Sequence, residues 1–188
     1  MSSLVGIAGR QGNCQEHKNV LDFLRVESKI VIDSKDVKGI THLILPGGES
    51  TTQEMLWKKT GLWDEIKKFK NPILGTCAGA IHLIKIIGNK NICCERNAFG
   101  NQKESFYREM DFGYGGKNKS LKAMFIRAPM ISYKGTNTNK SWQTWAKFKT
   151  PNTNNEIVAV AKLDQNWLSI CHPEAVGDDT LHKEFLDL

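Results

Sequence analysis

The chain has 188 residues, 40% of them hydrophobic and 24% charged, a composition typical of a globular protein large enough to bury its own core. No stretch approaches the roughly 18 apolar residues of a transmembrane helix, and the N-terminal sequence MSSLVGIAGRQG lacks the regions of a secretion signal. The net charge of +6 comes from scattered lysines, which argues against nucleic-acid binding. We expect a single domain over residues 1–188, located in the cytoplasm, with neither nucleic acid nor membrane as a partner.

The cysteines also indicate the compartment. Their number is odd, and their spacing fits neither a disulfide framework nor a zinc site. We therefore expect free thiols in a reducing compartment and no metal ion. The five positions are Cys14, Cys77, Cys93, Cys94 and Cys171.

Short apolar runs alternate with helical patterns through the first half of the chain. Strands are expected at 4–8, 29–32, 41–45 and 72–75, and helices at 14–24, 50–57 and 78–87. This alternation predicts an α/β fold with a mostly parallel sheet flanked by helices on both faces. Such folds place their ligand sites at the carboxyl ends of the strands.

The second half has a less regular pattern. Further strands are expected at 120–129, 141–148, 156–163 and 166–173, and a helical spacing of apolar residues occupies 180–188. Two Asn-rich segments, 134–140 and 150–156, are interpreted as surface insertions.

The sequence GTCAG at 75–79 joins an expected strand to an expected helix. It matches the nucleophile elbow G-x-S-x-G with cysteine in place of serine. A helix N-terminus favours negative charge, so Cys77 is placed where its thiolate would be stabilised. Taken alone, a cysteine between glycines is more often a small buried hydrophobe.

The sequence HPE at 172–174 follows the last expected strand and offers a partner for the thiol. We expect His172 and Glu174 to project to the same side of an extended segment, where the carboxylate orients the imidazole. Alone, this motif is usually a turn. Its occurrence together with the elbow, both at carboxyl strand ends, favours a Cys-His-Glu catalytic site. The remaining histidines, His17, His42, His82 and His182, are interpreted as surface or core residues.

The loop LPGGESTT at 45–52 supplies a third element at the same edge. Gly47 and Gly48 allow backbone N–H groups to face a ligand, and together with the N–H of Ala78 they could stabilise an oxyanion. The alternative is a plain strand-to-helix turn in which Ser50 or Thr51 caps the helix.

Together these residues resemble the class I (triad) glutamine amidotransferases, which have a flavodoxin-like α/β fold. Four further segments are similar to the glutaminase subunits of pyridoxal 5′-phosphate synthase. They are RQGN at 10–13, LPGGESTT at 45–52, ERNAFGNQKESF at 95–106 and FIRAP at 125–129. The motifs span nearly the whole chain, from residue 5 to residue 174.

The resemblance implies hydrolysis of L-glutamine to L-glutamate and ammonia, with Cys77 as the nucleophile, His172 as the acid and base, and Glu174 as its orienting partner. It also implies substrate contacts, an oxyanion hole formed by Gly48 and Ala78, and a role for Gln11 in coupling partner binding to activation. The implied substrate-binding residues are Gly48, Glu49, Ser50, Arg96, Ile126 and Arg127.

The implied partner is a synthase subunit that receives the ammonia for vitamin B6 synthesis, and no cofactor is needed for glutamine hydrolysis. Two alternatives remain. One is an amidotransferase that feeds another acceptor, as in imidazole glycerol phosphate synthesis. The other is a catalytically silent regulatory subunit on the same fold.

Overall fold

The computed structural model describes residues 3–100, 102–116, 118–135, 141–149 and 156–188. Within these residues one eleven-stranded sheet has the order β2-β1-β3-β4-β11-β10-β9-β6-β7, with β8 pairing β10 and β5 beside this path. The strands are β1 Leu4–Ala8, β2 Glu27–Val31, β3 His42–Leu45, β4 Ile73–Thr76, β5 Ile92–Glu95, β6 Phe106–Phe112, β7 Lys119–Phe125, β8 Met130–Tyr133, β9 Trp142–Lys149, β10 Glu156–Leu163 and β11 Asn166–Ser169. The α-helices are α1 Cys14–Phe23, α2 Ser50–Lys59, α3 Leu62–Lys68, α4 Ala78–Ile87 and α5 Thr180–Phe185; 3-10 turns occupy Ser34–Val37, Gln102–Glu104 and Glu174–Val176.

The sheet has a parallel and an antiparallel part. Strands β2, β1, β3, β4 and β11 are parallel to one another, whereas β10, β9, β6 and β7 pair antiparallel. The predicted α/β class is confirmed, but the sheet is mixed and its parallel order is confined to these five strands. Strand β11 is the boundary, because it pairs parallel with β4 and antiparallel with β10.

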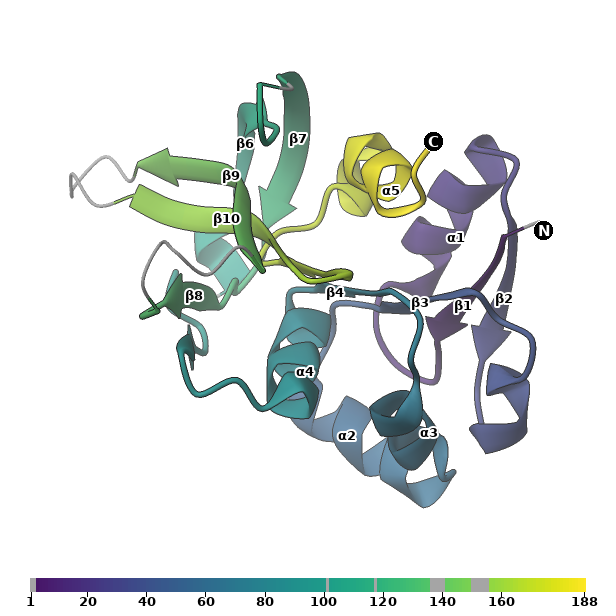
Figure 1. Ribbon diagram of the computed structural model, residues 1–188. Helices are drawn as coiled ribbons and strands as arrows, with labels where there is room; N and C mark the ends of the chain where they lie inside the picture. Colours follow the sequence, from purple (N-terminus) through teal and green to yellow (C-terminus); the bar gives the residue numbers. More distant parts are fainter. Residues whose placement is uncertain (1–2, 101, 117, 136–140, 150–155) are drawn as a thin grey trace.

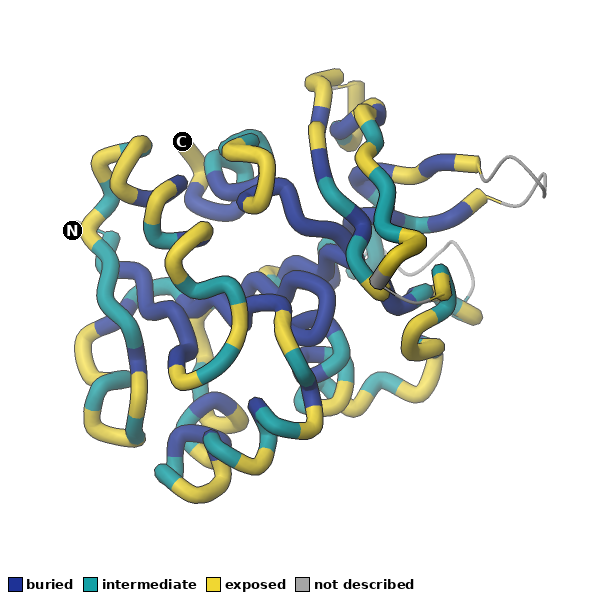
Figure 2. The backbone as a smooth tube through the Cα atoms, turned by 180° about the vertical axis from the view of Figure 1, so that it is seen from behind, coloured by how far each residue is buried: buried dark blue, intermediate teal, exposed yellow. Residues whose placement is uncertain are grey.

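Helices cover both faces of the parallel part, as predicted. In Figure 1, α1 and α5 lie on one side of it, and α2, α3 and α4 lie on the other. Each helix turns an apolar stripe inward: α1, for example, buries His17, Val20 and Leu21. In Figure 2 the central strands form a continuous buried layer between these helices.

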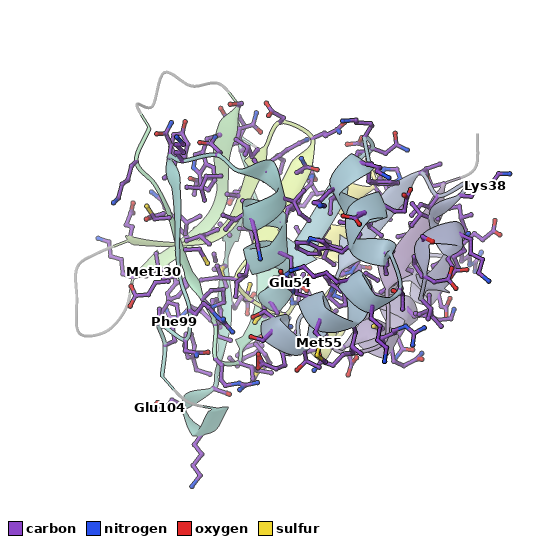
Figure 3. All side chains as sticks on the ribbon, turned by 90° about the horizontal axis from the view of Figure 1, so that it is seen from below. Lys38, Glu54, Met55, Phe99, Glu104 and Met130 are labelled. Atoms are coloured by element: carbon purple, nitrogen blue, oxygen red, sulfur yellow. The ribbon has the colours of Figure 1, made fainter. Side chains whose placement is uncertain are left out.

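The core contains aromatic side chains that also anchor loops. The fully buried Trp57 of α2 donates a hydrogen bond from its Nε1 to the Gly9 carbonyl at 2.9 Å. This bond ties the loop after β1 to the helix that follows β3. On the outer surface of the same helix, Glu54 (Figure 3) accepts bonds from Lys58 and from Lys85 of α4, each at 2.6 Å. Among the described residues, no helix has the length and apolarity needed to span a bilayer.

Several predicted elements differ in extent. The strand expected at 120–129 ends at Phe125, because Arg127 adopts a left-handed φ of 46°. The strand expected at 166–173 ends at Ser169. Helix α2 is capped by Glu49, whose side chain accepts the Thr51 N–H, rather than by a serine or threonine. The Asn-rich segments 134–140 and 150–156 lie mostly outside the described residues.

Candidate active site

Cys77 occupies the turn between β4 and α4, as the elbow motif predicts. Its backbone has φ 49° and ψ −106°, a region that L-residues rarely adopt and that commonly marks functional sites. Its N–H donates to the Ser169 carbonyl of β11 at 2.8 Å, and its own carbonyl accepts from Ala80 and Ile81 in the first turn of α4. The side chain is 7% exposed, so the thiol reaches a cavity while its backbone is fixed.

The elbow glycines allow close packing rather than an unusual backbone. Gly75 and Gly79 have ordinary φ angles, and the positive φ belongs to Cys77. A Cβ on Gly79 would overlap the Leu45 carbonyl of β3, and a Cβ on Gly75 would lie 2.5 Å from the Gly79 oxygen. The two glycines therefore let α4 lie directly against β3 and β4, which brings the helix start up to the thiol.

His172 and Glu174 meet on a turn, not on an extended segment. His172 forms an isolated antiparallel bridge with Met124, after which Pro173 adopts φ −62° and ψ −37° and Glu174 begins a 3-10 turn. The predicted extended geometry is wrong here, because the helical backbone at Pro173 folds the carboxylate back. The predicted contact forms nevertheless: His172 Nδ1 lies 2.9 Å from Glu174 Oε1.

The charges of this pair support each other. Burial alone would lower the pKa of His172, but hydrogen bonds to Cys77 and Glu174 and the charge of Glu174 raise it to about 10. Burial alone would raise the pKa of Glu174, but the His17, His172 and His182 side chains hold it well below the usual range. An imidazolium against a carboxylate is therefore the stable form at neutral pH.

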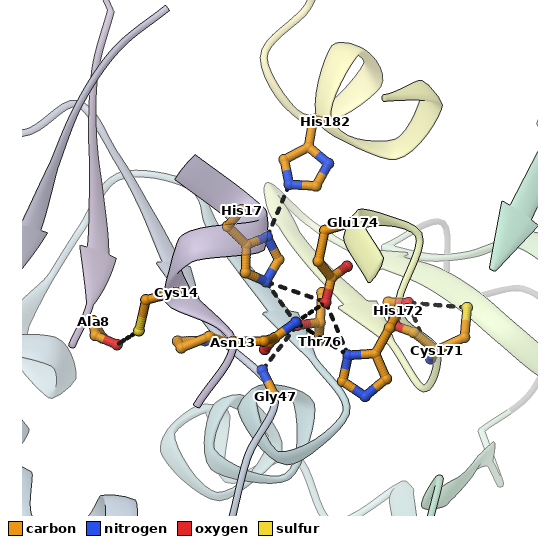
Figure 4. A network of polar contacts seen from close by, with 12 residues as sticks. Ala8, Asn13, Cys14, His17, Gly47, Thr76, Cys171, His172, Glu174 and His182 are labelled. Atoms are coloured by element: carbon orange, nitrogen blue, oxygen red, sulfur yellow. Dashed lines mark hydrogen bonds and ion pairs between the residues drawn. The ribbon is translucent and has the colours of Figure 1, made fainter. Parts of the chain in front are cut away.

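Asn13 and His17 lie against Glu174, and His182 lies behind His17; sequence reasoning assigned none of the three to the site (Figure 4). Asn13 Nδ2 donates to Glu174 Oε1 at 2.5 Å and lies 3.4 Å from His172 Nδ1. His17 Nε2 lies 3.4 Å from the same carboxylate oxygen, and its Nδ1 lies 2.9 Å from His182 Nε2. His17 and His182 are completely buried, so both are core residues, one of the two interpretations given from the sequence. The sequence did not indicate that they lie near the Glu174 carboxylate.

The glycine loop after β3 is held by side chains from three directions. The Gly47 N–H donates to Thr76 Oγ1 at 3.1 Å, and the Glu49 N–H donates to Gln11 Oε1 at 2.9 Å. Gln53 Nε2 donates to the Pro46 carbonyl at 3.1 Å. A Cβ on Gly48, whose φ is 154°, would overlap the Gln11 side-chain oxygen. Gln11 therefore packs directly against the loop predicted to form the oxyanion hole.

A cavity of about 260 Å³ brings most of the predicted residues together. This volume is at the small end for ligand sites. Glu174 and Gln11 lie behind its wall. Glu49 Oε1 lies 3.6 Å from Arg96 Nη2 at its edge, and Cys77 Sγ lies 3.8 Å from the Ile126 carbonyl. The predicted residues that line it are Gly48, Glu49, Ser50, Cys77, Ala78, Arg96, Ile126, Arg127 and His172.

The cavity carries charges of both signs, with Arg96 and Arg127 beside Glu49 and Glu16. A zwitterionic ligand of amino-acid size suits this lining, because a guanidinium binds a carboxylate and a carboxylate binds an ammonium group. In the described part of the chain, no three His, Cys, Asp or Glu side chains are grouped so as to hold a metal ion.

Comparison with known proteins gives concordant relatives. Residues 7–187 match the SNO glutamine amidotransferase family. A pyridoxal 5′-phosphate synthase subunit PdxT from Francisella philomiragia is 35% identical over 193 residues, covering 100% of each chain. A PdxT from Methanococcus maripaludis is 41% identical over 135 residues, covering 68% of this chain and 70% of its own.

Solved structures agree with this. A glutamine amidotransferase crystal structure superposes with a TM-score of 0.82 at 33% identity, covering 97% of each chain. A structure of PurLQS from Thermotoga maritima, at 14% identity and a TM-score of 0.61, covers 100% of this chain and 99% of its own and shares the fold.

Proposed function

The chain belongs to the SNO glutamine amidotransferase family, and we propose that it hydrolyses L-glutamine to L-glutamate and ammonia through Cys77, His172 and Glu174. One observation carries this assignment: Cys77 and His172 line the same amino-acid-sized cavity, and Glu174 Oε1 lies 2.9 Å from His172 Nδ1 behind its wall. A thiol, an imidazole and an orienting carboxylate are the parts that acyl transfer from an amide requires.

In the first step the Cys77 thiolate attacks the side-chain carboxamide carbon of glutamine. Backbone N–H groups of Gly48 and Ala78, which both line the cavity, would stabilise the oxyanion of the tetrahedral intermediate. His172 then donates its proton to the departing nitrogen, so the C–N bond breaks and ammonia and a thioester remain. A pKa of about 10 keeps that proton available at neutral pH.

In the second step a water molecule attacks the thioester carbon after ammonia has left. His172 accepts a proton from the attacking water, the C–S bond breaks, and glutamate leaves as the thiolate re-forms. Glu174 keeps the imidazole in place throughout, because its carboxylate is buried and accepts from His172 Nδ1. Arg96 and Arg127 are placed to hold the substrate α-carboxylate, and Glu49 and Ser50 lie beside them in the substrate loop.

The relatives' names extend the proposal to a partner. Because full-length relatives are named as pyridoxal 5′-phosphate synthase subunits, we propose that the ammonia passes to a synthase subunit in vitamin B6 synthesis. Gln11, which accepts a hydrogen bond from the Glu49 N–H, would transmit docking of that partner to the oxyanion loop. The five free thiols suit a reducing compartment such as the cytoplasm.

Ammonia release from glutamine, measured with and without the synthase subunit, tests the proposal. Cys77→Ala should abolish release, and Cys94→Ala, a half-buried cysteine on β5, should preserve it. Undiminished turnover in Cys77→Ala would refute the mechanism. Stimulation by the synthase subunit would separate this assignment from an amidotransferase that serves another acceptor.

A further inference from the structure

The mechanism above leaves two fully buried histidines without a role. His17 comes from α1 and His182 from α5, 165 positions apart in sequence, and their rings meet at a centroid distance of 5.2 Å. Burying two imidazoles costs free energy unless each polar atom is matched by a partner. His17 lies next to Glu174, and the His182 ring is joined to His17 (Figure 4).

The neighbours of His17 assign its protons. Its Nε2 lies 3.1 Å from Thr76 Oγ1 and 3.4 Å from Glu174 Oε1. The Thr76 oxygen already accepts the Gly47 N–H, and a carboxylate oxygen only accepts. A bare Nε2 would turn its lone pair toward the carboxylate oxygen, so we assign the proton of His17 to Nε2, which leaves Nδ1 to accept.

The tautomer of His182 follows from this. His17 Nδ1 can accept only if His182 carries its proton on Nε2, 2.9 Å away. His182 Nδ1, which has no partner among the described residues, is then a bare acceptor rather than a buried N–H without a partner. With these protons, His182 donates to His17, and the N–H of His17 faces Thr76 Oγ1 at 3.1 Å and Glu174 Oε1 at 3.4 Å.

The His17 contact reaches the oxygen that holds the catalytic imidazole. Oε1 of Glu174 is hydrogen-bonded to His172 Nδ1 and Asn13 Nδ2 and lies 3.4 Å from His17 Nε2, whereas its Oε2 has no partner among the described residues. All three of these contacts therefore fall on one oxygen atom. Losing one donor would change both its charge and its direction.

We propose that His17 and His182 are positioning residues for the glutaminase reaction, a buried hydrogen-bonded pair that packs against Glu174 Oε1 and fixes the carboxylate against His172. This inference rests on the proposed role of Glu174. The pair never touches substrate, because neither residue lines the cavity. The titratable groups that face the cluster from the surrounding elements are Glu16, Cys77, Cys171 and His172.

The test follows the alkylation of Cys77 by iodoacetamide, quantified by mass spectrometry of the peptide that carries it. Only the thiolate reacts, so the rate at pH 6 reports the imidazolium beside it, while the rate at pH 9 reports access to the thiol. In His182→Leu we expect the pH 6 rate to fall about threefold, with the pH 9 rate unchanged.

Two further substitutions keep the test decisive. His182→Gln, whose amide nitrogen reaches the position of Nε2, should restore the pH 6 rate. The asparagine of His182→Asn is polar but too short to reach His17, so the pH 6 rate should fall about as much as in His182→Leu. This variant supplies the measurement if His182→Leu does not fold. The matched control is His42→Leu, because His42 also contacts α5, through Phe185 at 5.2 Å, and its ring is remote from Glu174.

An equal loss of rate at both pH values in His182→Asn, or no loss at all, would overturn the proposal. The alkylation pattern does not depend on turnover. If the wild-type protein and its synthase partner release no ammonia from glutamine, the proposed function fails, while the pH 6 to pH 9 ratio still decides the role of the pair. With turnover present, His182→Asn should lower kcat and leave the KM for glutamine within twofold.

Discussion

Adding one methyl group at Gly47 should disable the site without unfolding the protein. Gly47 follows β3, and a Cβ built there overlaps His172 Cε1 and lies 3.0 Å from His172 Nδ1. To regain an ordinary carbon contact of about 3.5 Å, the imidazole must move by roughly 1 Å. The ring must move away from the loop, and we expect this shift to disturb the 2.9 Å contact between His172 Nδ1 and Glu174 Oε1.

A displacement of this size is costly for a reacting group. A misplacement of about 1 Å can reduce a rate by about 100-fold, equivalent to about 2.7 kcal/mol of transition-state stabilisation. We therefore expect kcat/KM for glutamine, measured by ammonia release in the presence of the synthase subunit, to fall about 100-fold in Gly47→Ala. Most of the loss should appear in kcat, because the cavity side chains proposed to bind glutamine stay in place.

The control is Gly6→Ala in β1, where a Cβ meets the flexible side chains of Ile40 and Val31 at 2.7 and 2.9 Å. This change should lower the urea midpoint and leave kcat/KM within twofold. If a folded Gly47→Ala protein kept wild-type kcat/KM, the loop would not position His172, and the reasoning would be refuted.

Three other changes probe the same framework. Glu174→Gln keeps the shape but removes the charge that holds the pKa of His172 at about 10, so the alkaline limb of the kcat/KM profile should move down by about one pH unit or more; an unmoved limb would contradict the pairing. Gly79→Ala would press a Cβ into the Leu45 carbonyl and should cost about 3 kcal/mol or more of unfolding free energy in urea titrations, and a loss within 0.5 kcal/mol would refute this packing. Burial lowers the pKa of His182 from 6.5 to about 3, so between these pH values the imidazole is protonated in the unfolded chain and neutral in the folded chain. The free energy of unfolding should therefore decrease as pH falls from 6.5 toward 3. His182→Leu should make this decrease less steep, as measured by urea midpoints.

The three side chains of the proposed triad could be located from the sequence because each lies in a short motif beside a predicted strand. Cys77 follows a buried apolar run, and His172 and Glu174 follow another. The carboxyl ends of parallel strands share one edge of the sheet, so local patterns were enough to bring them together.

The buried histidine pair could not be predicted in this way. His17 and His182 are single residues in different helices, and only the packing of α1 and α5 on the same face brings them behind Glu174. Asn13 precedes α1 without any motif that signals a carboxylate nearby. Contacts of this kind depend on tertiary structure, which no spacing within one segment records.

In the antiparallel part of the sheet, only some of the strands could be predicted from the sequence, for a different reason. Strand β6, FYREMDF, exposes Tyr107, Glu109 and Asp111 at alternate positions and buries only Met110 and Phe112, so it lacks the apolar run of a central strand. Strand β8 has four residues, and a turn at Arg127 separates it from β7. Segments this short and this polar gain their strand structure from pairing with neighbours, not from their own composition.

The register between β4 and β11 and a bridge to β7 together set the positions of the proposed nucleophile and base. Thr76 pairs with Ser169, and the next amide along, that of Cys77, donates to the Ser169 carbonyl at 2.8 Å. The imidazole lies three residues beyond Ser169, where the backbone of His172 exchanges two hydrogen bonds with Met124 of β7. The thiol is therefore tied to the parallel part of the sheet and the imidazole to its antiparallel edge, so an insertion that displaces β7 would separate the two reacting groups.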